Sequence, residues 1–165
     1  MTFAVDAVKA WLSEYREDEK ELDEQCERLE KLQAKMIGLG AQVITDMPIV
    51  HGASNDRLTD LIAKKDEIDT SIKKLAMKHL KDRENIEKVV SELKTAEEKS
   101  VVRLRYVDAL RWEDVSQLIF GKKDDYMGKE DSYLRRVFLT HGNALTGMVD
   151  ILQQEQYQAL AEQIF

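Results

Sequence analysis

A heptad repeat runs through residues 58–96, whose sequence is LTDLIAKKDEIDTSIKKLAMKHLKDRENIEKVVSELKTA. Apolar side chains recur there at seven-residue steps, and a second set is interleaved with the first at three- and four-residue steps. This spacing places both sets on one stripe of an α-helix, as at the a and d positions of a coiled coil. Polar residues interrupt the stripe at Lys65, His79 and Asp82. The predicted seam consists of Leu61, Ile68, Ile72, Leu75, Ile86, Val89 and Leu93.

A helix of this length needs a partner for its seam, either residues 3–37 or the same helix of a second subunit. Residues 3–37 carry a matching stripe, made of Val8, Trp11, Leu12, Tyr15, Leu22, Leu29, Leu32 and Met36. The sequence therefore predicts an antiparallel, coiled-coil-like helical hairpin over residues 1–94. Self-association, most simply as a dimer, is also expected, because one hairpin is not expected to cover both seams along such a length.

A linker over residues 38–56 is expected to join the two helices. Gly38 and Gly40 are predicted to end the first helix, because glycine readily adopts the left-handed conformation used at C-caps. The segment that follows contains the single proline, Pro48, and several turn-forming residues. The candidates for capping the next helix are Ser54, Asn55 and Asp56.

A cluster of shorter helices is predicted for residues 95–165. Thr95 and Glu98 have the spacing of a capping box, which predicts a helix that starts near Thr95 and fades at residues 108–110. A second helix is expected at 112–120, closed by Gly121. A third is expected at about 131–142, and a fourth at about 143–164, after the break that Gly142 predicts.

The net charge of −7 is unevenly distributed. Residues 1–34 carry −5, residues 101–142 carry +1, and residues 143–165 carry −3 without any Lys or Arg. A strongly basic domain would have indicated nucleic-acid binding directly. Because no segment is more than weakly basic, any DNA-binding surface must be local.

The chemistry-bearing residues do not suggest an enzyme. The single cysteine, Cys26, cannot form an intramolecular disulfide, and the three histidines, His51, His79 and His141, have no metal-ligand spacing. No catalytic residue, cofactor or metal is therefore expected. The sequence also lacks a long uncharged apolar run of the kind found in signal peptides and membrane spans, so a cytoplasmic protein is expected.

Two short motifs carry a resemblance to a known family. Residues 104–115, LRYVDALRWEDV, resemble the signature of sigma-factor region-4-like helix-turn-helix domains in phage regulators. Residues 141–145, HGNAL, resemble the end of the recognition helix in those domains. With the long charged helix and the heptad helix, the chain is similar to a family of small proteins from phages and prophages of Gram-positive bacteria, related to ArpU/RinA-type late-gene transcription activators.

The resemblance implies an all-α fold in which the long hairpin is followed by a small helix-turn-helix cluster and a C-terminal helix. It also implies double-stranded DNA as a partner, transcription regulation in the bacterial host cell, and host RNA polymerase as a further candidate partner. The helix predicted at 131–142 would be the recognition helix.

Helical geometry predicts which side of this helix faces DNA. Taking Leu134 as pointing inward places Val137, Phe138, His141 and Leu145 on the inward side, so His141 is interpreted as a core residue. Arg136, on the opposite side, is the predicted base-reading residue. The other predicted DNA-contacting residues are Arg135, Ser132, Tyr133, Thr140, Asn143, Lys122, Lys123 and Lys129.

One departure from the family keeps other functions open. The turn before the recognition helix is short in the family, but here it is the loop 121–131, which contains Asp124, Asp125, Glu130 and Asp131. Four acids beside a DNA face oppose phosphate binding. The alternative is a protein-interaction or assembly module that dimerises through its helices without binding DNA, and a small-terminase-like DNA packaging protein has the same parts.

Overall fold

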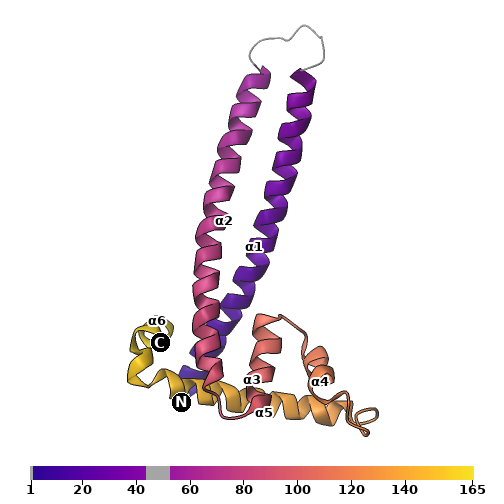
Figure 1. The fold of residues 1–165 in the computed structure, drawn as a ribbon, viewed down its shortest axis with the longest axis vertical. Helices are drawn as coiled ribbons and strands as arrows, with labels where there is room; N and C mark the ends of the chain where they lie inside the picture. Colours follow the sequence, from indigo (N-terminus) through magenta and orange to yellow (C-terminus); the bar gives the residue numbers. More distant parts are fainter. Residues whose placement is uncertain (1, 44–52) are drawn as a thin grey trace. The chain divides into compact units, whose positions relative to one another are not determined.

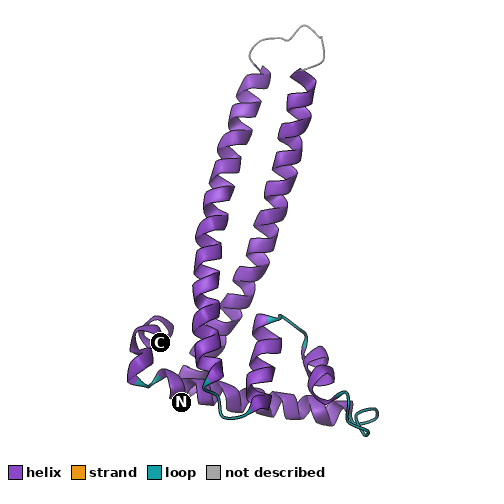
Figure 2. Cartoon of the chain, in the orientation of Figure 1, coloured by secondary structure: helices purple, strands orange, loops and turns teal. Residues whose placement is uncertain are grey.

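The computed structural model describes residues 2–43 and 53–165, and all the regular structure in these two ranges is helical (Figure 2). The predicted all-α fold is confirmed. The elements are α1 (Thr2–Val43), α2 (Ala53–Ser91), α3 (Ala96–Val102), the π-helix η1 (Arg103–Val107), α4 (Trp112–Phe120), α5 (Glu130–Leu152), the 3-10 helix η2 (Glu155–Tyr157) and α6 (Gln158–Ile164).

Helices α1 and α2 pack against each other as the predicted antiparallel pair (Figure 1). Each predicted seam residue is shielded from solvent, half-buried from Leu61 to Leu75 and buried at Ile86, Val89 and Leu93, the last of which follows the end of α2. Between them, Met77 and Leu80 lie off the seam and are exposed. The seam is therefore covered within a single chain, so it does not by itself require a second copy, and the dimer stays a prediction.

The glycines at the end of α1 do not stop it. The helix continues through Gly38 and Gly40 to Val43, and α2 already begins at Ala53. The predicted helix end at residue 37 is therefore wrong, and Ser54, Asn55 and Asp56 lie within the first turn of α2. Glycine in a helix costs about 1 kcal/mol but keeps both backbone hydrogen-bonding groups, so it permits a helix to continue. Pro48 and His51 lie outside the described residues.

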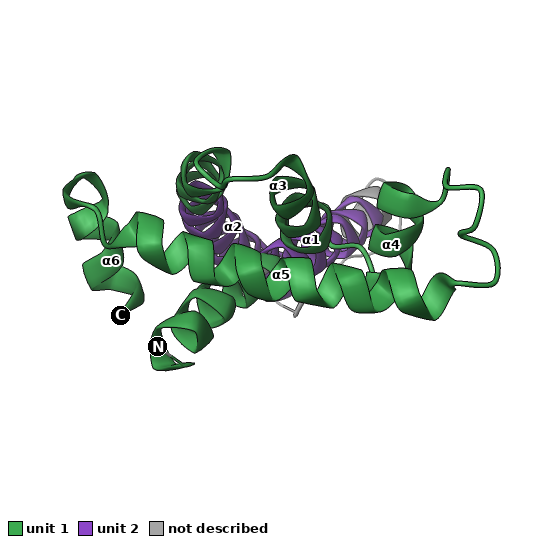
Figure 3. Cartoon of the chain, turned by 90° about the horizontal axis from the view of Figure 1, so that it is seen from below, with its two compact units in different colours: residues 1–17, 80–165 green, residues 18–79 purple. Residues whose placement is uncertain are grey.

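Two compact units divide the chain, and Figure 3 shows them in different colours. Unit 1 comprises residues 1–17 and 80–165, and unit 2 comprises residues 18–79. The expected boundary was near residue 94. The division differs because the beginning of α1 and the end of α2 belong to the same core as α5. That core contains Val8, Leu12, Tyr15, Ile86, Val89, Val90, Leu93, Val102, Tyr106, Val107, Ala144, Leu145, Met148, Val149, Ile151 and Leu152.

Unit 2 consists of the remaining parts of α1 and α2. Its most buried apolar residue is Leu32, at 9% exposure, and the seam of α2 packs along the same stripe of α1. A polar contact also joins the two helices: Lys78 donates a hydrogen bond to Asp18, whose side chain is only 13% exposed. The unit is therefore held by a narrow apolar seam, and the Lys78–Asp18 ion pair lies across it.

The helices after α2 follow the predicted order with two corrections. The helix predicted at 143–164 is not continuous, because α5 ends at Leu152 and the 3-10 helix η2 precedes α6. The Thr95 side chain accepts a hydrogen bond from the Glu98 backbone while Glu98 accepts one from the Thr95 backbone, so the capping box is confirmed. Helix α4 has the predicted bounds. The predicted break at Gly142 is wrong, because α5 is continuous from Glu130 to Leu152. Buried residues recur at helical spacing on both sides of Gly142, and this packing carries the helix through the glycine.

Candidate nucleic-acid interface

The residues that carry the family resemblance lie in one packed network in unit 1. A hydrogen bond of 2.9 Å joins the Tyr106 hydroxyl to His141 Nε2, and both side chains are buried. The Trp112 ring makes edge-to-face contacts with two α5 side chains, with its centroid 4.8 Å from that of His141 and 5.2 Å from that of Phe138. The prediction that Phe138 faces inward is wrong, because its side chain lies against Trp112 at the surface and is 45% exposed. These contacts join η1, α4 and α5, so the motif fixes the arrangement of the three helical segments.

Burial sets the protonation of this network. Desolvation, aided by the positive charges of Lys9 and Arg105, lowers the pKa of His141 to about 4. Burial also raises the pKa of the Tyr106 hydroxyl. Both groups are therefore neutral near pH 7, and the expectation that His141 belongs to the core agrees with its 8% exposure.

Two arginines hold the turn between η1 and α4. Arg105 donates a 2.8 Å hydrogen bond to the carbonyl of Leu110, and its guanidinium lies 4.6 Å from the centroid of the Trp112 ring. Arg16 donates to the carbonyl of Ala109 over 3.3 Å. Ala109 has a φ of 55°, in the left-handed region that a residue with a Cβ rarely adopts. The arginine of the LRY motif is thus engaged in fixing this turn.

The acidic loop before α5 folds onto its own residues. Asp125 accepts hydrogen bonds from the Tyr133 hydroxyl, at 2.5 Å, and from Lys129 Nζ, at 3.0 Å. These bonds lower the pKa of the Asp125 carboxyl. The Tyr133 ring stacks between those of Phe120 and Tyr126, with centroids 5.0 and 5.6 Å away. The side chains of Tyr133 and Lys129, both predicted to contact DNA, therefore donate hydrogen bonds to Asp125 in this structure.

The side chains of Arg136 and Thr140 also bind a carboxylate of the same chain, that of Glu97 in α3. Arg136 donates two hydrogen bonds to the Glu97 carboxylate, Nε to Oε1 at 3.1 Å and Nη2 to Oε2 at 2.8 Å. The Thr140 hydroxyl donates to the same Oε1 at 3.0 Å. The predicted base-reading arginine thus lies at the edge between α3 and α5, a position that the sequence could not show because Glu97 is remote along the chain.

The remaining predicted residues lie on the outward face of α5 and in the loop before it. Ser132, Arg135, Lys122 and Lys123 are exposed, and among the described residues their side chains make no hydrogen bond or ion pair. Sequence reasoning missed Leu139, which is 68% exposed. Ser132, Arg135 and Leu139 are spaced three and four residues apart, so they share one helical face. The signal was available, because this leucine falls on the side opposite the core stripe.

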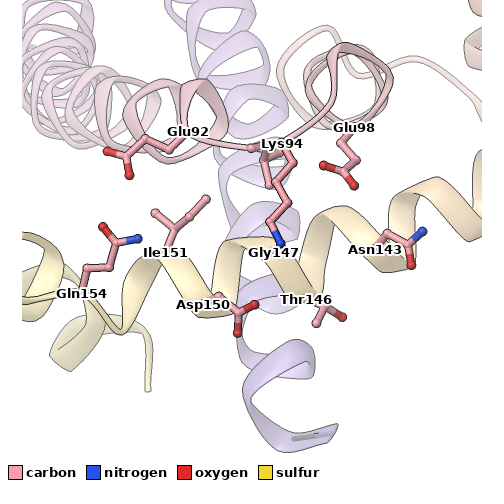
Figure 4. A pocket seen from close by; sticks show the side chains of 10 residues that line it. Glu92, Lys94, Glu98, Asn143, Thr146, Gly147, Asp150, Ile151 and Gln154 are labelled. Atoms are coloured by element: carbon pink, nitrogen blue, oxygen red, sulfur yellow. The ribbon is translucent and has the colours of Figure 1, made fainter.

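A cavity of about 410 Å³ opens between the turn after α2 and the C-terminal half of α5 (Figure 4). Three carboxylates line it, from Glu92, Glu98 and Asp150, and Figure 4 shows Lys94 extended toward α5. Asn143, the last predicted DNA-contacting residue, lies on its rim. Because the acids outnumber the single lysine, the cavity disfavours phosphate.

Comparisons of the chain with protein-family models, with curated proteins and with solved structures find no match. In the part of the chain that the structure describes, no group of three His, Cys, Asp or Glu side chains is placed to hold a metal ion. None of the described helices is long and apolar enough to cross a membrane.

Proposed function

We propose that the chain is a DNA-binding regulator of transcription, of the phage type that its motifs resemble, and that α4 and α5 form its helix-turn-helix. One observation carries the proposal. The motif residues Tyr106, Trp112 and His141 pack together and fix α4 against α5. The exposed side chains in the first turns of α5 include Ser132 and Arg135, beside the acids Glu130 and Asp131. A recognition helix needs this division between a buried side that holds it and a free side that contacts bases.

The outward face of α5 suggests a role for each side chain. Arg135 takes the place of Arg136 as the base-reading residue, since its guanidinium is free to bond N7 and O6 of guanine. Leu139, one turn further on, can contact the methyl group of thymine. Lys122 and Lys123 come from the loop that leads into α5 and would contact phosphates.

Binding to DNA can be measured by fluorescence anisotropy with random duplexes across a range of salt. Arg135→Ala should weaken binding to the preferred sequence by about 1–3 kcal/mol and relax the preference at one base pair. Replacing Lys122 and Lys123 together by Ala should weaken all sequences alike and lower the salt slope by about two units. Arg83→Ala is the matched control, because Arg83 is an exposed arginine on α2, outside the helix-turn-helix. Absence of binding to any duplex at low salt would overturn the proposal.

A second candidate is a protein-interaction or assembly module that dimerises through its helices without binding DNA. It is favoured by exposed apolar side chains near the acidic loop, Leu118 at 63% and Met127 at 82% exposure. Sedimentation of the wild type and of Leu118→Asp and Met127→Asp variants separates the two candidates. Self-association that the substitutions abolish, without DNA binding, would establish the second one. A monomer that binds DNA would exclude it.

A further inference from the structure

Arg136 and Thr140 form a small site for an oxyanion on the edge of α5. They lie four residues apart on one helix, and together they donate three hydrogen bonds of 2.8 to 3.1 Å to the two oxygens of a single carboxylate. The fork of two parallel N–H donors in an arginine fits a phosphate as well as it fits a carboxylate. The occupant in this structure is Glu97, which belongs to the same chain.

The Arg136 side chain is held in place by a second contact besides its ion pair with Glu97. The Arg136 guanidinium lies 4.8 Å from the centroid of the Phe120 ring, which is 3% exposed and stacks on Tyr133. Cation–π contact with a fixed aromatic ring restricts an arginine to one region of space. Arg136 therefore remains positioned for an anion when Glu97 moves away.

Glu97 is an occupant that can be displaced. In the pair that it forms with Arg136, the arginine side chain is 53% exposed and the glutamate side chain 26% exposed. Ion pairs in contact with solvent contribute little stability, so a second anion can compete for the arginine. A backbone phosphate of DNA lying against the outward face of α5 would reach this edge from the neighbouring turn, where Ser132 is exposed.

We infer that Arg136 and Thr140 form a phosphate-binding site that Glu97 closes in the free protein, and that a DNA backbone phosphate displaces the Glu97 carboxylate on binding. The inference rests on the proposed function for the source of the phosphate. It assigns Arg136 to the backbone of the duplex and leaves the bases to Arg135. Glu97 then weakens binding of every DNA sequence equally, because a phosphate carries no base identity.

The test compares Glu97→Gln with Glu98→Gln in DNA titrations. Both variants remove one negative charge from α3, and glutamine at position 98 can still complete the capping box with Thr95. Glu97→Gln should tighten binding of all duplexes by roughly two- to fivefold more than Glu98→Gln does, which is the range expected for releasing an exposed ion pair. In an Arg136→Ala background the two substitutions should have the same effect. Equal effects in the wild-type background, or an advantage of Glu97→Gln that persists without Arg136, would overturn the inference.

A second measurement separates this site from the proposed function. Inorganic phosphate, compared with chloride at equal ionic strength, should raise the melting temperature of Glu97→Gln more than that of the wild type. The effect should disappear in Glu97→Gln/Arg136→Ala and shrink in Glu97→Gln/Thr140→Val. If no variant binds DNA but this pattern holds, the anion site stands and the proposed function fails. If DNA binding depends on Arg135 while Glu97→Gln equals Glu98→Gln and phosphate has no effect, only the anion site fails.

Discussion

Lowering the pH should reduce the free energy of unfolding of unit 1, and the contribution of His141 to this loss can be calculated from its pKa. The pKa of His141 falls from its ordinary value of 6.5 to about 4 in the folded chain. The unfolded chain therefore takes up the proton first, so this stability is present above pH 6.5 and is lost as the pH falls toward 4. At pH 5 the unfolded histidine is protonated and the folded one is neutral, which costs at most about 2 kcal/mol.

The assay is denaturant unfolding followed by tryptophan fluorescence at about pH 7.5 and pH 5. Both tryptophans, Trp11 and Trp112, belong to unit 1, so the fluorescence signal comes from that unit. His141→Gln keeps a polar partner for Tyr106 but removes the titrating group. The carboxylates titrate alike in both proteins, so the wild type should lose about 2 kcal/mol more than the variant. An equal loss in the two proteins would refute the assignment of His141 as a buried neutral group.

Four substitutions probe other features by denaturant unfolding. Ala109→Gly should raise the free energy of unfolding by about 0.5–1 kcal/mol, because glycine adopts a φ of 55° without the Cβ penalty; a decrease would show that the turn is not strained. Gly121→Ala should lower it by about 1–3 kcal/mol, because an added Cβ would lie 2.3 Å from the carbonyl oxygen of Gln117, and an unchanged value would contradict this close approach. Arg136→Ala should lower it by about 1 kcal/mol through loss of its ion pair, whereas Arg135→Ala should leave it within about 0.5 kcal/mol. Equal effects of the two arginine substitutions would contradict the structural role given to Arg136.

Periodic and local features were predictable from the sequence because they depend on neighbours along the chain. The predicted seam positions from Leu61 to Leu93 are all shielded from solvent, since the repeat determines which side of a helix is apolar. The capping box at Thr95 depends on two residues of one turn. The inward position of His141 follows from its spacing to Val137 and Leu145. Each of these predictions uses only the geometry of one helix.

Features that depend on a second helix were not predictable. Arg136 lies on the side of α5 away from the core stripe, yet its guanidinium donates hydrogen bonds to the carboxylate of Glu97 in α3. The glycines at 38, 40 and 142 were expected to end helices because their intrinsic cost is visible in the sequence. At Gly142 the packing that offsets this cost comes from other elements. The sequence likewise could not show that the ends of the hairpin share a core with α5.

Unit 1 is formed by two separate segments of the chain, and this has a consequence for folding during synthesis. Residues 18–79 are inserted between the two parts of one core. Val8 and Leu12 can therefore pack against Met148 and Leu152 only after those residues have been synthesised. The insertion is an antiparallel pair of helices, whose contacts can form as soon as α2 has emerged. By forming early, the hairpin would bring the beginning of the chain back beside residue 80 and replace a long loop closure with a short one. A fragment that starts at residue 95 would lack the buried side chains of α1 and α2 on which its own helices pack.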